Sequence, residues 1–399
     1  MSTIVIGAGQ AGSSCVAKLR AEGYEDRITL VGAELAPPYQ RPPLSKKYLL
    51  GEMELERLYL RPIEFYGDQK IDLRLGRVVT AIDAKAKTVK IGDELMKYDS
   101  LVLTTGSIPR RLPAAIGGDL HGVYTVRDLQ DVDLMTPEFV KGKRVLIVGG
   151  GYIGLEAAAV AALKGLDVTL VELSERILQR VACKETSDFY RDLHVSNGVE
   201  IMEGVGLDHL AGEGRVTKAV LSDGTEIDVD FVIVGVGISP ATELAEMAGL
   251  SLDNGIKTDE FGQTSEPNIW AAGDCASFPY KGERIRLESV PNAIDQAETV
   301  ALNILGKKVE YIAKPWFWSD QYDIKLQIAG LNSGYDNIVV RMVGVARSHW
   351  YYRGDTLLAV DAMNAPRDYM VAKRLIESHK TADKGKVIEP ETDLKTLLA

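Results

Sequence analysis

Residues 3–34 read TIVIGAGQAGSSCVAKLRAEGYEDRITLVGAE, and this stretch decides the fold. An apolar strand over 3–6 is predicted to enter the turn Gly7-x-Gly9-x-x-Gly12, followed by a helix over 13–22 and a strand over 27–31. Gly7 permits the sharp turn, Gly9 lets a pyrophosphate approach the backbone, and Gly12 lets the helix pack closely on the strand. The N–H groups at the helix start then favour phosphate. The stretch therefore predicts a dinucleotide site.

A second copy of this pattern begins at Lys143. A strand over 144–148 precedes Gly149-x-Gly151-x-x-Gly154, and an alanine-rich helix over 155–163 and a strand over 168–172 follow. Glu172 lies 21 residues after Gly151 (172 − 151), close to the offset of about 20 expected for an acid on a ribose hydroxyl. Because a carboxylate repels a 2′-phosphate, the pattern favours NADH over NADPH. The two copies together predict two nucleotide sites.

Three further strand ends carry small or acidic residues. They are the turn at Thr105-Gly106, the glycine-containing end of the strand over 229–237, and the turn Gly273-Asp274, after which a helix is predicted. In doubly wound sheets, ligands bind at the carboxyl ends of the strands. Asp274 is accordingly either the N-cap of the predicted helix or a ligand of the ribityl and pyrophosphate part of a flavin.

Composition excludes several functional classes. At 399 residues the chain has length for two or three domains, and its net charge of −11 argues against binding nucleic acid. The apolar stretch 145–163 contains several glycines and Glu156, so it is interpreted as a buried strand and helix rather than a membrane span. The first core strand is predicted to start at residue 3, so no signal peptide is expected. Three scattered cysteines predict neither a disulfide framework nor a metal site, and they fit a reducing cytoplasm.

Residues 37–46 read PPYQRPPLSK. The prolines predict a rigid extended loop that leads into a helix near Ser45, with Lys46 in the first turn of that helix. The positive potential of a helix start disfavours a lysine there. Lys46 is therefore either a solvated loop residue or a lysine held for chemistry.

From roughly Pro315 the predicted pattern of secondary structure changes. Short alternating strands are predicted within 316–360, and a helix over 367–378 follows. Three of the four tryptophans lie between 316 and 350. Trp316 and Trp318 are either core or interface packing residues, or part of a site.

The first glycine fingerprint and six further segments together carry a family resemblance. The segments are PPYQRPPLSKKYL, LVLTTGS, VLIVGGGYIGLEAA, NIWAAGDCA, ESVPNA and PWFWSDQYDIKLQIAG. They resemble the glutathione-reductase-type ferredoxin reductases, which serve bacterial cytochromes P450 and ring-hydroxylating oxygenases. The resemblance runs essentially end to end. It implies an α/β fold with two Rossmann-like domains, the NAD(H)-binding domain (111–239) inserted in the FAD-binding domain (1–110 and 240–314), and a small C-terminal α/β domain (315–399).

The resemblance also implies the chemistry: FAD accepts hydride from NADH and passes single electrons to a [2Fe–2S] ferredoxin. The expected FAD-binding residues are Gly7, Gly9, Ala11, Gly12, Glu34, Arg41, Lys46, Val79, Thr105, Gly106, Arg127, Gly273, Asp274, Val290 and Trp318. The expected NADH-binding residues are Gly149, Gly151, Ile153, Gly154, Glu156, Glu172 and Gly237. Relatives often carry Asp directly after Val-Gly, where this chain has Ala33, so Glu34 is expected to replace it at the ribose.

Three of these residues are expected to act in catalysis. Lys46 is predicted to pair with Glu156 beside flavin N5, and Trp318 to cover the flavin edge that faces ferredoxin. Since ferredoxins of this class are usually acidic, docking should use a local basic patch. The candidates for this patch are Lys46, Lys47, Lys307, Lys308, Lys325 and Arg341.

Four other functions are alternatives for a chain with two nucleotide sites. A disulfide reductase needs paired cysteines, and an NADH peroxidase or oxidase needs a reactive cysteine near 40–46; the sequence has neither. A redox-sensing interaction protein resembling apoptosis-inducing factor usually has a targeting segment and long basic insertions, which are absent from this sequence. A rubredoxin reductase shares both nucleotide sites and differs chiefly in its partner, so it stays open.

Overall fold

The computed structural model describes residues 1–398, which form two compact units. Unit 1 comprises 1–40, 55–108 and 238–315, and unit 2 comprises 41–54, 109–237 and the chain from 316 onward. Residues 41–54, which the sequence analysis assigned to the FAD-binding domain, pack in unit 2. The three-domain division itself stays a prediction.

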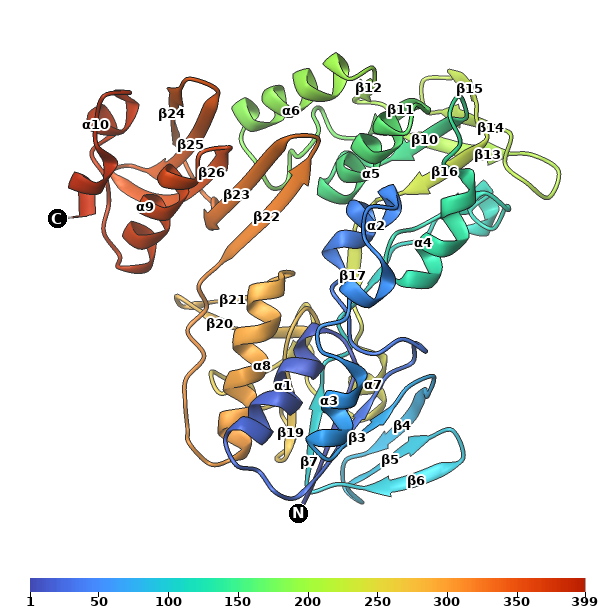
Figure 1. Cartoon of the computed structure of the whole chain (residues 1–399), viewed down its shortest axis with the longest axis vertical. Helices are drawn as coiled ribbons and strands as arrows, with labels where there is room; N and C mark the ends of the chain where they lie inside the picture. Colours follow the sequence, from blue (N-terminus) through green and yellow to red (C-terminus); the bar gives the residue numbers. More distant parts are fainter. Residues whose placement is uncertain (399) are drawn as a thin grey trace. The chain divides into compact units, whose positions relative to one another are not determined.

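Unit 1 is built on a parallel five-stranded sheet (Figure 1). Its strands in spatial order are β19 (Ile269–Ala271), β7 (Ser100–Leu103), β1 (Ser2–Ile6), β2 (Arg27–Val31) and β3 (Ile71–Arg74). Helices α1 (Gln10–Ala21) and α8 (Val290–Ile304) pack against one another, with Cys15, Val16, Ala297 and Val300 in the buried core. Because β1, β7 and β19 are parallel, their carboxyl ends lie at the same edge of the sheet.

Smaller elements complete unit 1. They are α3 (Ile63–Asp68), α7 (Glu243–Met247), the antiparallel sheet of β4 (Val79–Asp83), β5 (Thr88–Ile91) and β6 (Glu94–Lys97), the sheet of β18 (Ile256–Lys257), β20 (Ala276–Tyr280) and β21 (Glu283–Ile285), and the pair β8 (Ser107–Pro109) and β17 (Ile238–Pro240).

Unit 2 contains a second parallel sheet. Its strands in spatial order are β12 (Glu200–Glu203), β11 (Asp167–Glu172), β10 (Arg144–Val148), β16 (Phe231–Val234) and β9 (Val123–Tyr124). Helix α5 (Tyr152–Leu163) is buried along most of its length, because its alanines allow close packing on the sheet. The same unit holds α2 (Lys47–Leu50), α4 (Leu129–Met135), α6 (Lys184–Ser196) and the sheet of β13 (Leu207–Ala211), β14 (Lys218–Leu221) and β15 (Glu226–Asp228).

The C-terminal part of unit 2 is an antiparallel five-stranded sheet (Figure 1). Its order is β22 (Trp316–Gln321), β23 (Ile324–Gly330), β26 (Thr356–Met363), β25 (Ala346–Arg353) and β24 (Asn337–Val343). Helix α9 (Pro366–Glu377) packs on β23 and β26, and the short helix α10 (Lys384–Ile388) follows. Trp350, Val360 and Leu375 are fully buried in this core.

Two predictions of local structure are corrected. After Asp274 the chain enters strand β20 rather than a helix, so Asp274 is not an N-cap. Lys46 does not lie in the first turn of a helix: it follows the 3-10 turn Pro42–Ser45 and is the N-cap residue of α2, with φ −137° and ψ −114°. Within residues 1–398, no helix is long and apolar enough to cross a membrane.

Candidate functional site

The first glycine turn of unit 1 has the geometry of a phosphate cradle. Gly7 has φ 112°, and a Cβ on it would lie 2.1 Å from the Thr104 carbonyl oxygen. A Cβ on Gly12 would lie 2.0 Å from the Gly7 carbonyl oxygen. Gly9 differs, because nothing lies within 4 Å of the place where its Cβ would be. Gly7 and Gly12 are thus required by the fold, whereas the absence of a Cβ at Gly9 leaves space for a ligand at the start of α1.

Other predicted FAD residues surround this turn. A Cβ on Gly273 would lie 3.1 Å from the Ala11 Cβ, so the ends of β19 and α1 meet. The Ser107 hydroxyl donates a hydrogen bond to Asp274 (3.0 Å), and the Thr105 hydroxyl donates to the Ala241 carbonyl (2.7 Å). The acceptor capacity left on Asp274 could hold a hydroxyl-rich ligand chain.

Three further unit 1 positions have distinct settings. Glu34 follows β2 and accepts a hydrogen bond from the Tyr39 hydroxyl (2.5 Å), which orients the carboxylate. Val79 is the buried first residue of β4. Val290 is the half-buried first residue of α8. Their contacts with FAD stay predictions.

The second glycine turn, in unit 2, repeats the first. A Cβ on Gly149 would lie 2.5 Å from the Gly235 carbonyl oxygen, and one on Gly154 would lie 2.1 Å from the Gly149 carbonyl oxygen. At Gly151 nothing lies within 4 Å. Ile153 is 42% exposed at the start of α5. The same division into fold-required and ligand-facing glycines indicates a second pyrophosphate cradle.

Glu172 lies at the end of β11, beside the second turn. Its carboxylate accepts hydrogen bonds from the Gly150 N–H (2.7 Å) and the Ser174 N–H (2.8 Å). These two bonds fix the carboxylate against the glycine turn, where an adenine ribose would lie in a Rossmann fold. Gly237 follows β16 with φ 101° and open space at its Cβ position.

The predicted pair of Lys46 and Glu156 is confirmed. The Lys46 Nζ lies 2.9 Å from the Glu156 Oε1, although the residues are 110 positions apart (156 − 46). Glu156 is 4% exposed on α5. The Ser45 and Ser319 hydroxyls each donate to its carboxylate at 2.6 Å, so both oxygens are satisfied. A buried charge of this kind is tolerated because it is paired and hydrogen-bonded.

The two serines were missed by the sequence analysis. Each stands next to a residue that it did select, Lys46 or Trp318, but hydroxyl side chains carry no pattern that reveals a distant carboxylate. Ser319 reaches Glu156 from strand β22 of the C-terminal sheet. Only the fold could reveal this contact.

The other expected catalytic and FAD-binding residues of unit 2 lie on separate elements. The Arg41 guanidinium donates to the Arg127 carbonyl (2.8 Å), and the Arg127 N–H donates to Asp131 (2.9 Å). Trp318 is half-buried on β22, with its ring centroid 5.6 Å from that of Trp316. The expected FAD residues are thus divided between both units: Arg41, Lys46, Arg127 and Trp318 belong to unit 2 and the others to unit 1.

One candidate of the basic docking patch is wrong. Arg341 is 4% exposed, and its guanidinium donates to the backbone carbonyls of Val387, Glu389, Pro390 and Thr392. It therefore anchors the C-terminal segment inside unit 2 and is not available to a partner. Lys46 is engaged by Glu156, and Lys307 is paired with Glu22. Lys47, Lys308 and Lys325 are exposed.

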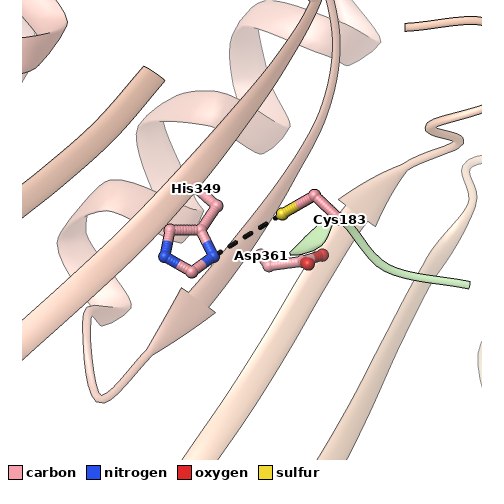
Figure 2. A group of neighbouring side chains, drawn as sticks. All are labelled: Cys183, His349 and Asp361. Carbon is pink, nitrogen blue, oxygen red and sulfur yellow. Dashed lines mark hydrogen bonds between the residues drawn. The ribbon is translucent and has the colours of Figure 1, made fainter. Parts of the chain in front are cut away.

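A second buried polar cluster contains Cys183, His349 and Asp361, whose ligand-type atoms lie within 4.8 Å of one another. Figure 2 shows the His349 ring turned toward the Cys183 thiol, with the Asp361 carboxylate beside them; the Nδ1–Sγ distance is 3.8 Å. This residue set is one that can hold a transition metal. No local sequence pattern predicts this cluster, because the three residues are far apart in the chain.

The hydrogen bonds of the cluster favour a closed network over a cation. The Arg347 Nε donates to the His349 Nε2 (2.8 Å), which places the imidazole proton on Nδ1, facing the Thr186 hydroxyl at 2.7 Å. Thr186 donates to Asp361 (2.7 Å), as does the Tyr351 hydroxyl. A protonated Nδ1 cannot bind a metal, and the guanidinium adds positive charge. The cluster therefore joins α6 to the C-terminal sheet.

Buried titratable groups in unit 2 predict acid sensitivity. Burial lowers the pKa of His194 to about 4 and that of His349 to about 3, and it raises the pKa of Asp361 to about 6. Below pH 6.5 these histidines are protonated in the unfolded chain but stay neutral in the folded protein. Each of them therefore lowers the free energy of unfolding by about 1.4 kcal/mol per pH unit as the pH falls. Asp361 has the opposite effect on stability. Its raised pKa means that the folded protein keeps this proton up to about pH 6, so the stability it contributes is present at low pH and lost as the pH rises through 6.

We expect urea unfolding between pH 6.5 and 4.5 to show a net loss of stability on acidification, since two histidines oppose one aspartate. The variant His194→Gln should reduce that loss by about 1.4 kcal/mol per pH unit. Equal slopes for the variant and the parent protein would contradict a neutral His194 in the folded state. His121→Gln is the matched control, because it makes the same substitution at a histidine that is exposed.

Comparison with known proteins agrees with this geometry. Residues 1–297 match the pyridine nucleotide-disulphide oxidoreductase family, and residues 316–398 match the reductase C-terminal family. The chain is 40% identical to rhodocoxin reductase of Rhodococcus erythropolis, with 100% of this chain and 95% of the relative covered. It is also 40% identical to putidaredoxin reductase of Pseudomonas putida, covering 100% and 97%.

Solved structures give the same result. The covalent complex of putidaredoxin reductase with putidaredoxin contains a chain that matches with a TM-score of 0.96 at 39% identity, covering 100% of this chain and 98% of that one. The α/β fold and its division into an oxidoreductase part and a C-terminal part are thereby confirmed. The chain belongs to the pyridine nucleotide-disulphide oxidoreductase family, among its members with a reductase C-terminal domain, together with putidaredoxin reductase and related ferredoxin reductases.

Proposed function

We propose that this protein is an FAD-containing, NADH-dependent ferredoxin reductase that supplies a [2Fe–2S] ferredoxin of an oxygenase system. The observation that carries the proposal is the pair of glycine cradles, one in each unit, combined with the buried Lys46–Glu156 pair beside the second cradle's helix. The relatives named above, a rhodocoxin reductase and a putidaredoxin reductase, support the same assignment. A cytoplasmic location belongs to the same proposal, since three buried, unpaired cysteines fit a reducing compartment.

The residues of the chain bind and orient the reactants. Gly9 and Gly151 leave room for the two pyrophosphates, and Glu172 is placed to select NADH through its ribose hydroxyls. When bound, FAD supplies the chemistry, since a flavin can accept a hydride and release electrons singly. Lys46 holds a positive charge beside Glu156, where it can stabilise negative charge that develops during hydride transfer.

The test is anaerobic stopped-flow mixing of the purified protein with NADH, followed by mixing with a panel of [2Fe–2S] ferredoxins and a rubredoxin. The proposal expects rapid flavin bleaching with NADH, slow bleaching with NADPH, and re-oxidation by a ferredoxin. Re-oxidation by rubredoxin alone would identify a rubredoxin reductase. If only oxygen re-oxidised the flavin, the proposal would fail in favour of an oxidase or a redox-sensing protein.

Replacing Trp318 with alanine is expected to slow ferredoxin reduction by about fivefold, because an aromatic contact is worth about 1 kcal/mol. Flavin reduction by NADH should stay unchanged. Trp316→Ala is the comparison, since Trp316 packs against the C-terminal core and Tyr369 and should lower the melting temperature instead. If Trp318→Ala leaves ferredoxin reduction intact, the ring is a packing residue only.

A further inference from the structure

Four consecutive hydrogen bonds lead away from the carboxylate of Glu156 through the interior of unit 2. They run Ser319 Oγ to Glu156 Oε1 (2.6 Å), Gln321 Nε2 to Ser319 Oγ (3.2 Å), His194 Nε2 to Gln321 Oε1 (2.8 Å) and Tyr322 OH to His194 Nδ1 (3.2 Å). Ser319, Gln321 and His194 are all buried. This row of hydrogen bonds joins α5, strand β22 and α6. Of its members, only Glu156 was predicted from the sequence as a site residue.

The chemistry of the groups fixes the direction of every bond. A carboxylate paired with Lys46 can only accept, so Ser319 must give its single proton to Glu156. Ser319 is then the acceptor for Gln321, whose amide nitrogen must face it. The amide oxygen of Gln321 consequently faces His194, and since an oxygen of this kind only accepts, the His194 Nε2 carries the proton.

The far end of the row is consistent with this direction. With its proton on Nε2, the His194 Nδ1 accepts a hydrogen bond from the Tyr322 hydroxyl, and burial raises the pKa of that phenol, which keeps it a donor. Tyr322 has φ 54°, in the left-handed region that favours glycine, yet its ring lies edge-on to His194 with centroids 5.1 Å apart. All four donors therefore point toward Glu156.

We propose that Ser319, Gln321 and His194 are positioning residues for hydride transfer, which hold the Glu156 carboxylate in the orientation that pairs it with Lys46. Bonds that are all aligned in one direction polarise one another and strengthen the last of them, at the carboxylate. The C-terminal sheet thus takes part in the NADH half of the reaction as well as in any contact with a partner. This inference rests on the proposed function.

The kinetic test uses Ser319→Ala and a matched control, Ser348→Ala. Both serines are fully buried in the C-terminal sheet and both donate to a carboxylate at 2.6 Å, but Ser348 donates to Asp368. We expect Ser319→Ala to lower the limiting rate of flavin reduction by about tenfold with an unchanged Kd for NADH. Ser348→Ala should leave the rate unchanged, and Ser319→Thr, which keeps the hydroxyl, should restore it.

A double-mutant cycle separates positioning from general damage. In a Glu156→Gln background, Ser319→Ala should cause no further loss, because its effect acts through that carboxylate. A full tenfold loss in that background would overturn the proposal. If the parent protein's flavin is not reduced by NADH at all, the proposed function fails; if it is reduced and Ser319→Ala equals the parent, only this inference fails.

An independent test does not depend on turnover. Histidine labelled with ¹⁵N, with the His194 signals assigned by their loss in His194→Gln, reports which ring nitrogen is protonated. We expect the neutral tautomer with the proton on Nε2 at pH 7, which fits the lowering of the pKa of His194 to about 4. A proton on Nδ1 would reverse the row of donors and overturn the inference.

Discussion

Replacing Lys46 with methionine is expected to slow flavin reduction by NADH by about 10²-fold, the usual effect of removing one group that stabilises charge in a transition state. The Lys46 Nζ lies 2.9 Å from Glu156, which is almost completely buried. Methionine keeps the length and apolar stem of the side chain and removes only the charge. The measurement is the limiting rate in anaerobic stopped flow at saturating NADH.

Two controls isolate the role of this charge. Lys47→Met changes an exposed neighbour and should leave the rate unchanged. Since Lys46→Met leaves the buried Glu156 carboxylate unpaired, a loss of stability of about 3 kcal/mol should accompany the slower rate. The double variant Lys46→Met/Glu156→Gln should recover much of that stability but not the rate. An unchanged rate in Lys46→Met would show that the ion pair is only structural.

Replacing Gly151 with valine is expected to weaken NADH binding by about 10²-fold while the protein folds and keeps its flavin. Nothing lies within 4 Å of a Cβ at this position, so the side chain fits the fold, but it occupies the space in which the pyrophosphate would lie. The Kd for NADH from flavin-bleaching titrations and the flavin content of the purified variant provide the two readouts.

Gly154→Val and Gly9→Val complete the comparison. A Cβ on Gly154 would lie 2.1 Å from the Gly149 carbonyl oxygen, so this variant should lose stability as well as NADH binding. The Cβ position of Gly9 in the first cradle is equally open, so a valine there fits the fold but occupies the space for the flavin pyrophosphate. The Gly9→Val protein should therefore purify without flavin and with a folded unit 2. Normal NADH affinity in Gly151→Val would exclude the second turn as the NADH site.

The sequence by itself determined both Rossmann units, because their strand–glycine–helix pattern is local. Gly7, Gly9 and Gly12 recur at the spacing of Gly149, Gly151 and Gly154, and the structure gives both triads the same open and closed positions. The turn is dictated by which residues lack a Cβ, and that is visible within a few residues. The family motifs extended this prediction across the whole chain.

Predictions from local sequence were wrong at two positions whose structure depends on distant segments. Asp274 precedes a strand rather than a helix, since the following residues pair with β18 and β21. Arg341 looked like a surface cation, but the C-terminal segment folds over it and satisfies its guanidinium with four backbone carbonyls. Alternation and charge reveal neither kind of pairing. The carbonyls that bind Arg341, for example, lie 46 to 51 residues further along the chain and meet it only in the folded protein.

The catalytic environment was decided by tertiary structure. The pairing of Lys46 with Glu156 was predicted. No sequence pattern indicated that Ser45 and Ser319 bind the same carboxylate, or that Gln321 and His194 continue the hydrogen bonds beyond Ser319. A hydroxyl or an amide gains its role from the direction of its hydrogen bonds. Those directions exist only once strands and helices far apart in the chain have packed together. For this reason the sequence identified the two glycine turns, whereas the tertiary structure decided which groups hold the Glu156 carboxylate.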